Sequence, residues 1–122
     1  MQPTMLFSVS IIMFLFIFLF GFQLRRQGKP YQVIPFNLHK FLCLGLLVVF
    51  ILQVYPMGWV WINDALKATL IILIGLLYLG LIVTGGLSSA LKDIPPVITL
   101  IHKIAPYLTL LLVVVFFFVL PG

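Results

Sequence analysis

The side chains best suited to chemistry in this sequence are its two histidines, His39 and His102. Each is followed by a lysine, Lys40 or Lys103, and the two His-Lys pairs are 63 residues apart. Neutral imidazole is a common ligand of haem iron, and helical bundles hold haem through side chains on facing helices. At equal depth on separate helices, the histidines could clamp haem b from both sides, with the lysines near its propionates. All four residues are therefore candidate haem-binding residues.

Three other interpretations of the histidines stay open. His39, Cys43 and His102 together could hold zinc or copper, because thiolate and imidazole are ligands for both metals. Histidine also titrates near neutral pH, so the pair could handle protons or a quinone. The simplest alternative is that each imidazole hydrogen-bonds to water or to a backbone carbonyl near the membrane interface and binds no cofactor.

A catalytic constellation of the soluble type is missing from the sequence. The only carboxylates are Asp64 and Asp93, which we expect at opposite membrane interfaces, and no serine has a neighbouring His-Asp set. We therefore expect no catalytic residues and favour a protein that is not an enzyme. Because Cys43 is the only cysteine, the chain can form no intramolecular disulfide.

The elements that position these residues are predicted to cross a membrane. Of the 122 residues, 64% are hydrophobic and only 7% are charged, whereas soluble domains are about 45–50% apolar and about 25% charged. This composition excludes a soluble domain, a disordered chain and a nucleic-acid-binding module. We expect a lipid bilayer as the surroundings, and another membrane protein or a second copy of the chain as a partner.

Four apolar segments are long enough to cross a bilayer, which takes about 20 residues. They predict an all-α four-helix transmembrane bundle that forms a single domain, 1–122, in the cell membrane. Proline and glycine separate the segments, at Gly28-Lys29-Pro30, Pro56-Met57-Gly58, Gly85-Gly86 and Pro95-Pro96. The predicted spans are 5–22, 35–55, 61–84 and 97–120.

Basic residues predict the orientation of these spans. The first and third connections are rich in lysine and arginine, which mark cytoplasmic loops. The second connection is instead rich in tyrosine and tryptophan, which favour membrane interfaces. Both termini are therefore predicted outside. The basic side chains near the first and third connections are Arg25, Arg26, Lys29, Lys92 and Lys103.

The two His-Lys pairs belong to a weak internal repeat. The same 63-residue offset carries Lys29 onto Lys92, and a glycine, Gly21 or Gly85, is expected to close the preceding span in each half. This similarity predicts two tandem helical hairpins related by an axis along the membrane normal. Parallel repeats of this kind tend to place binding sites at the repeat interface.

Small and polar residues predict close packing of the third and fourth spans. Gly80 and Thr84 form a small-xxx-small pair, which is typical of helices that approach closely. In the fourth span, Thr99, His102, Pro106 and Thr109 form a polar stripe. Pro106 has no N–H for the carbonyl of the histidine four residues earlier, so we expect a kink there.

Short motifs carry a resemblance over the whole chain. They are Lys29-Pro30-Tyr31, Leu38-His39-Lys40, Thr84-Gly85-Gly86-Leu87 and Ile101-His102-Lys103. With these motifs the chain resembles small bacterial four-helix membrane proteins to which no activity is assigned. Its two histidines also resemble the bis-histidine pair of transmembrane b-type cytochromes, which implies haem b and electron transfer. Those larger families often carry more than one histidine pair, whereas this chain has one.

Overall fold

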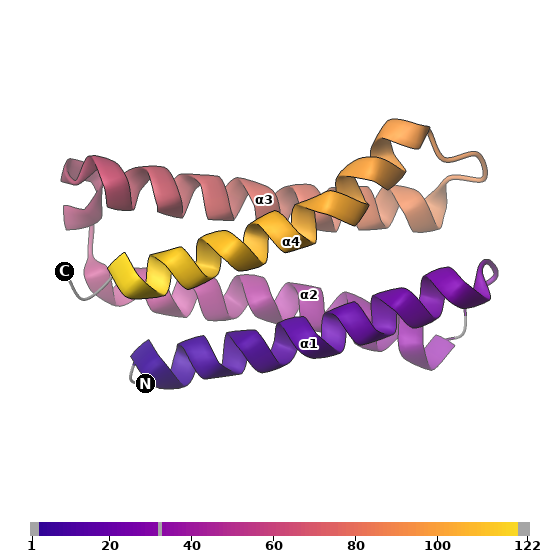
Figure 1. Cartoon of the computed structure of the whole chain (residues 1–122), viewed down its shortest axis with the longest axis horizontal. Coiled ribbons are helices and arrows are strands. Elements are labelled where there is room, and N and C mark those ends of the chain that lie inside the picture. The colour runs from indigo at the N-terminus through magenta and orange to yellow at the C-terminus, as the bar shows by residue number, and fades with distance from the viewer. Residues whose placement is uncertain (1–2, 32, 120–122) are drawn as a thin grey trace. The chain divides into compact units, whose positions relative to one another are not determined.

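A computed structural model describes residues 3–31 and 33–119, and over these residues it contains helices and no strand. Four long helices form two hairpins, each a compact unit (Figure 1). Each of the four is long and apolar enough to cross a membrane, which confirms the prediction of an all-α chain with four such helices. The first hairpin pairs α1 (Pro3–Gln27) with α2 (Val33–Val54), and the second pairs α3 (Ala65–Ala90) with α4 (Pro96–Val119).

Helix α1 continues past its predicted end near residue 22. Arg25 and Arg26 lie in its last turn, where positive charge favours the carbonyl end of the helix dipole. The helix ends at a glycine: Gly28 has a φ of 73°, and its N–H donates to the Leu24 carbonyl at 2.9 Å. Such a left-handed residue after a helix caps its last carbonyls at low cost only when it has no side chain.

The connection between the hairpins contains two short 3-10 helices, η1 (Tyr55–Met57) and η2 (Val60–Asn63). Trp61 lies in η2, so it does not begin the third span as predicted. Helix α3 begins instead at Ala65, because the Asp64 carboxylate caps its first turn. That carboxylate accepts the backbone N–H groups of residues 66 and 67 at 3.1 and 3.3 Å.

The prediction that Gly85-Gly86 separates the third span from the fourth is wrong. Both glycines lie inside α3, which runs on to Ala90. Each glycine costs about 1 kcal/mol of helix propensity, and continued pairing of the backbone within an apolar segment outweighs that cost. Pro96 begins α4, in the first-turn position where a missing N–H does no harm. The predicted end of the fourth span, Leu120, lies outside the described residues.

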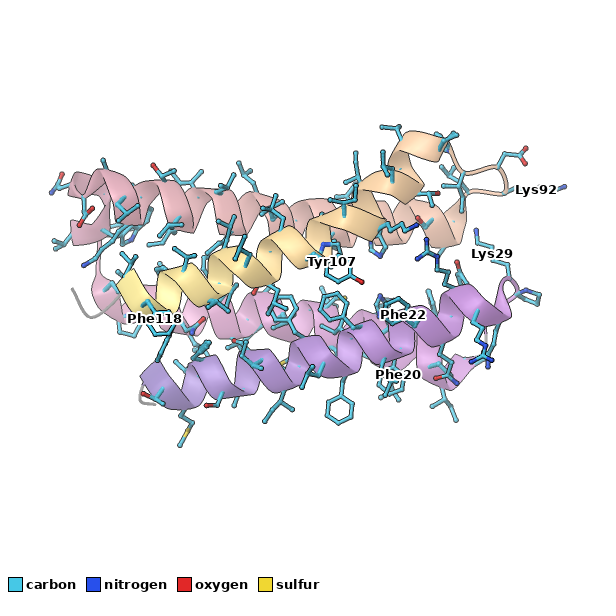
Figure 2. The ribbon with its side chains drawn as sticks, viewed as in Figure 1. Phe20, Phe22, Lys29, Lys92, Tyr107 and Phe118 are labelled. Carbon is cyan, nitrogen blue, oxygen red and sulfur yellow. The ribbon has the colours of Figure 1, made fainter. Side chains whose placement is uncertain are left out.

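Each helix buries one stripe of side chains and exposes the rest of its apolar surface. Most of the buried residues follow one another at intervals of three or four along their helix, as one face of a helix requires. Many of the large apolar residues elsewhere on all four helices are more than half exposed, as lipid-facing side chains would be. Lys29 and Lys92 project from the connections of the two hairpins (Figure 2). The buried residues of α1 and α3 include Leu6, Ser10, Phe14, Ile17, Leu24, Leu70, Ile74, Tyr78 and Thr84.

Candidate functional site

The two histidines occupy equivalent places in the two hairpins. His39 lies six residues after Val33, the first residue of α2, and His102 lies six residues after Pro96, the first residue of α4. At a rise of 1.5 Å per residue, each imidazole is about 9 Å along its helix from the connection. Both side chains are half-buried. The predicted equivalence of the two positions along their helices is therefore confirmed.

His39 is tied to the helix beside it. Its ring nitrogen Nδ1 lies 3.1 Å from the backbone carbonyl oxygen of Ile17 on α1. A carbonyl oxygen can only accept a hydrogen bond, so Nδ1 carries the proton and donates it. In an α-helix that carbonyl also accepts the N–H of the residue four positions later, Gly21, and it still has a second lone pair for the imidazole.

His102 makes the corresponding contact in the second hairpin with a hydroxyl group. Its Nδ1 lies 2.8 Å from Oγ1 of Thr84 on α3. The Thr84 hydroxyl donates to the Gly80 carbonyl at 2.8 Å and approaches the Leu81 carbonyl at 3.3 Å. Thr84 is buried, with 6% of its surface exposed. Each histidine is thus hydrogen-bonded to the preceding helix of its own hairpin.

A glycine makes room for each imidazole ring. A Cβ atom placed on Gly21 would lie 3.2 Å from Cε1 of His39, and one on Gly85 would lie 3.1 Å from Cε1 of His102. Both distances are shorter than ordinary van der Waals contact between carbon atoms. The prediction that Gly21 and Gly85 close the preceding spans is therefore wrong, because α1 and α3 run past them. The glycines do not close their helices; they let the rings lie against them.

The other candidate residues have different surroundings. Lys40 and Lys103 are exposed, and Nζ of Lys40 lies 6.0 Å from the ring centroid of Phe41. Cys43 is half-buried, one turn after His39 on α2. Among the described residues, no group of three or more His, Cys, Asp or Glu side chains is placed to hold a metal ion. The haem ligand pair and the mixed zinc or copper set both draw residues from two hairpins, and both remain predictions.

The residues of the polar stripe of α4 become more buried from its N-terminal end toward Thr109. Thr99 is exposed and His102 is half-buried, whereas Thr109 is completely buried and donates its hydroxyl proton to the Ala105 carbonyl at 2.7 Å. Pro106 lies inside the helix and has no N–H to donate to the carbonyl of His102. The first, orange turns of α4 run at a different slope from its yellow turns (Figure 1). An interior proline accounts for such a bend.

Sequence reasoning missed Ile17 and identified Thr84 only as a packing residue. A geometric signal could have found both neighbourhoods. In a hairpin of antiparallel helices, residues equally far from the middle of the connection lie at the same level along the two helices. The first pair of helices ends at Gln27 and resumes at Val33, and the second ends at Ala90 and resumes at Pro96. The midpoints between these ends pair Gly21 with His39 and Thr84 with His102.

Comparison with known proteins found no match to this chain among protein-family models, curated proteins or solved structures.

Proposed function

We propose that this chain is a small integral membrane protein that binds haem b, with His39 and His102 as the two axial ligands of the iron. Haem iron held by two imidazoles changes between its ferric and ferrous states, so the protein would transfer single electrons. The two ligands come from different hairpins, one from each half of the internal repeat.

The observation that carries this proposal is the shared hydrogen-bonding pattern of the two imidazoles. Histidines that bind metals almost always donate their other ring N–H to a carbonyl, carboxylate or similar acceptor, which fixes the tautomer and strengthens the ligand. His39 donates from Nδ1 to the Ile17 carbonyl, and Nδ1 of His102 lies against the Thr84 hydroxyl. In this arrangement Nε2 is the ligand nitrogen on each ring.

The surroundings of the histidines also suit haem. The macrocycle is largely apolar, and the helices that carry the histidines are rich in leucine, valine and phenylalanine. The propionates are anionic and need a wet, positively charged neighbourhood. Lys40 and Lys103 directly follow the histidines and are exposed, so their ammonium groups can reach an interface.

A second function is favoured by the same hydrogen bonds. Each imidazole joins the two helices of its own hairpin, so the two histidines could serve stability alone. The protein would then be a membrane protein that assembles with a partner and binds no cofactor. A buried interhelical hydrogen bond in a membrane contributes about 0.6 kcal/mol on average. The absorption spectrum separates the two functions, because only the first requires haem.

The test is the spectrum of the full chain purified in mild detergent from haem-replete cells. We expect a red protein with a low-spin Soret band, sharp visible bands after reduction, and little binding of carbon monoxide, because two strong ligands leave no open position on the iron. A colourless protein that takes up no added haemin would overturn the proposal. In that case, bound zinc or copper would favour the His39–Cys43–His102 site, and absence of metal would favour the structural role.

The orientation of the protein is a separate prediction. Arg25, Arg26 and Lys29 near one hairpin connection, and Lys92 in the other, favour cytoplasmic placement of both. A reporter fused after Gly122 should therefore read as external, and one inserted after Gln27 as cytoplasmic. The opposite pair of signals would reverse the orientation and place both histidines near the outer face.

A further inference from the structure

We infer that Thr84 is a positioning residue for His102: it holds the proton of the imidazole on Nδ1, so that Nε2 is the nitrogen presented to a metal. The inference about the tautomer stands on the hydrogen bonds of the second hairpin. Its consequence for iron rests on the proposed function. The two parts can be tested separately, because the tautomer is measurable in the protein without haem.

The hydrogens around the Thr84 hydroxyl decide which nitrogen of His102 is protonated. This group has one proton and three neighbours within hydrogen-bond distance: the carbonyl oxygens of Gly80 and Leu81, and Nδ1 of His102. Carbonyl oxygens can only accept. Two oxygen atoms 2.8 Å apart, as in the pair from Thr84 and Gly80, need a hydrogen between them, so the hydroxyl proton belongs to the Gly80 carbonyl.

The imidazole must then supply the second hydrogen. With the hydroxyl proton committed to Gly80, Nδ1 of His102 can form a hydrogen bond at 2.8 Å only by donating to a lone pair on Oγ1. The opposite assignment, with Thr84 donating to a bare Nδ1, leaves two oxygen atoms, Oγ1 of Thr84 and the Gly80 carbonyl oxygen, 2.8 Å apart with no hydrogen between them. In a buried site an unmade hydrogen bond costs about 1–3 kcal/mol, so the Nδ1–H tautomer is strongly favoured.

The first hairpin reaches the same tautomer by another route. The acceptor for His39 is the backbone carbonyl of Ile17, which no side-chain substitution removes. The acceptor for His102 is a side chain and can be changed. The two histidines of one molecule therefore provide a variable site and an internal reference.

Loss of the Thr84 hydroxyl should also alter a bound haem. A ligand imidazole that donates its other N–H is a stronger base and favours the ferric state. Without this acceptor, His102 becomes a weaker donor to iron, and the reduction potential rises. No similar change is expected from the loss of a threonine hydroxyl that does not contact a histidine.

The experiment compares Thr84→Val with Thr84→Ser and with a matched control, Thr109→Val. Valine has the shape of threonine without the hydroxyl, and serine keeps the hydroxyl. Thr109 is also buried, in the same hairpin, and also donates to the carbonyl four residues earlier. The tautomer of each histidine is read from the ring ¹⁵N chemical shifts of the haem-free full chain in detergent, and the potential from the haem-loaded protein.

We expect His102 of the wild type, Thr84→Ser and Thr109→Val to be protonated on Nδ1. In Thr84→Val we expect the proton to be shared with or moved to Nε2, while His39 keeps its wild-type shifts. Of the haem-loaded proteins, only Thr84→Val should have a raised potential. Wild-type His102 protonated on Nε2 would overturn the inference without any variant, and so would a Thr84→Val protein with unchanged His102 shifts. The expected shifts in a protein that binds no haem would support the role of Thr84 and refute the proposed function.

Discussion

The proposed function predicts that replacement of His102 or His39 by alanine abolishes the low-spin haem spectrum while the protein still inserts into the membrane. Insertion depends on the apolar length of the helices, which one substitution does not change. In the proposed site, haem binding would depend on one ring nitrogen from each histidine. Loss of even an outer partner of a metal ligand costs about 10- to 100-fold in affinity, so loss of the ligand itself should cost at least that factor. The measurement is haem content per chain, together with the reduced-minus-oxidised spectrum.

Glutamine at the same positions separates a ligand from a structural residue. The side-chain amide of His39→Gln or His102→Gln can still hydrogen-bond to an oxygen on the neighbouring helix, but it does not replace imidazole on iron. The glutamine variants should therefore retain the stability of the hairpins and lose the low-spin spectrum. Lys40→Ala and Lys103→Ala serve as controls with milder effects, because these exposed side chains touch at most the propionates. A His102→Ala protein with the wild-type spectrum would remove this residue from the proposed site.

The sequence was sufficient to predict the four helices because apolar length is a strong and direct signal. The ends of the helices were harder to predict. Arg25 and Arg26 mark where α1 leaves the apolar segment, yet the helix ends only at Gln27, before Gly28, where the backbone adopts a positive φ. Charge reports the polarity of the surroundings, whereas the end of a helix is decided by backbone conformation and capping.

The error in the predicted end of α3 also explains why the role of Thr84 could not be predicted. An interpretation of Gly85-Gly86 as a break between spans places Thr84 at the end of a span. In the structure it lies well inside α3 and faces His102. The partner of His39 could not be predicted from side-chain chemistry at all, because it is the backbone carbonyl of Ile17, and every residue has one. What distinguishes that carbonyl is the glycine one turn later, which leaves it accessible to the ring.

The neighbouring glycines of α3 offer the sharpest test of this packing, because Gly86→Ala should stabilise the protein and Gly85→Ala should not. Alanine at Gly86 would meet no atom within 4 Å, so it should stabilise the helix by about 0.5–1 kcal/mol through reduced backbone entropy of the unfolded chain. Alanine at Gly85 would place Cβ 3.1 Å from Cε1 of His102. The ring must then move by a few tenths of an ångström, which weakens its 2.8 Å hydrogen bond to Thr84.

A hydrogen bond of this kind contributes about 0.5–1.5 kcal/mol, so its weakening offsets the gain in helix propensity. The two variants should therefore differ by about 1 kcal/mol in the free energy of unfolding in detergent, with Gly86→Ala the more stable. Only Gly85→Ala should shift the ring ¹⁵N signals of His102. Gly21→Ala should act on His39 in the same way, because its Cβ would lie 3.2 Å from that ring. Equal stabilisation by Gly85→Ala and Gly86→Ala, with unchanged histidine signals, would show that His102 does not lie against α3 at this point, and the basis for the role of Thr84 would be lost with it.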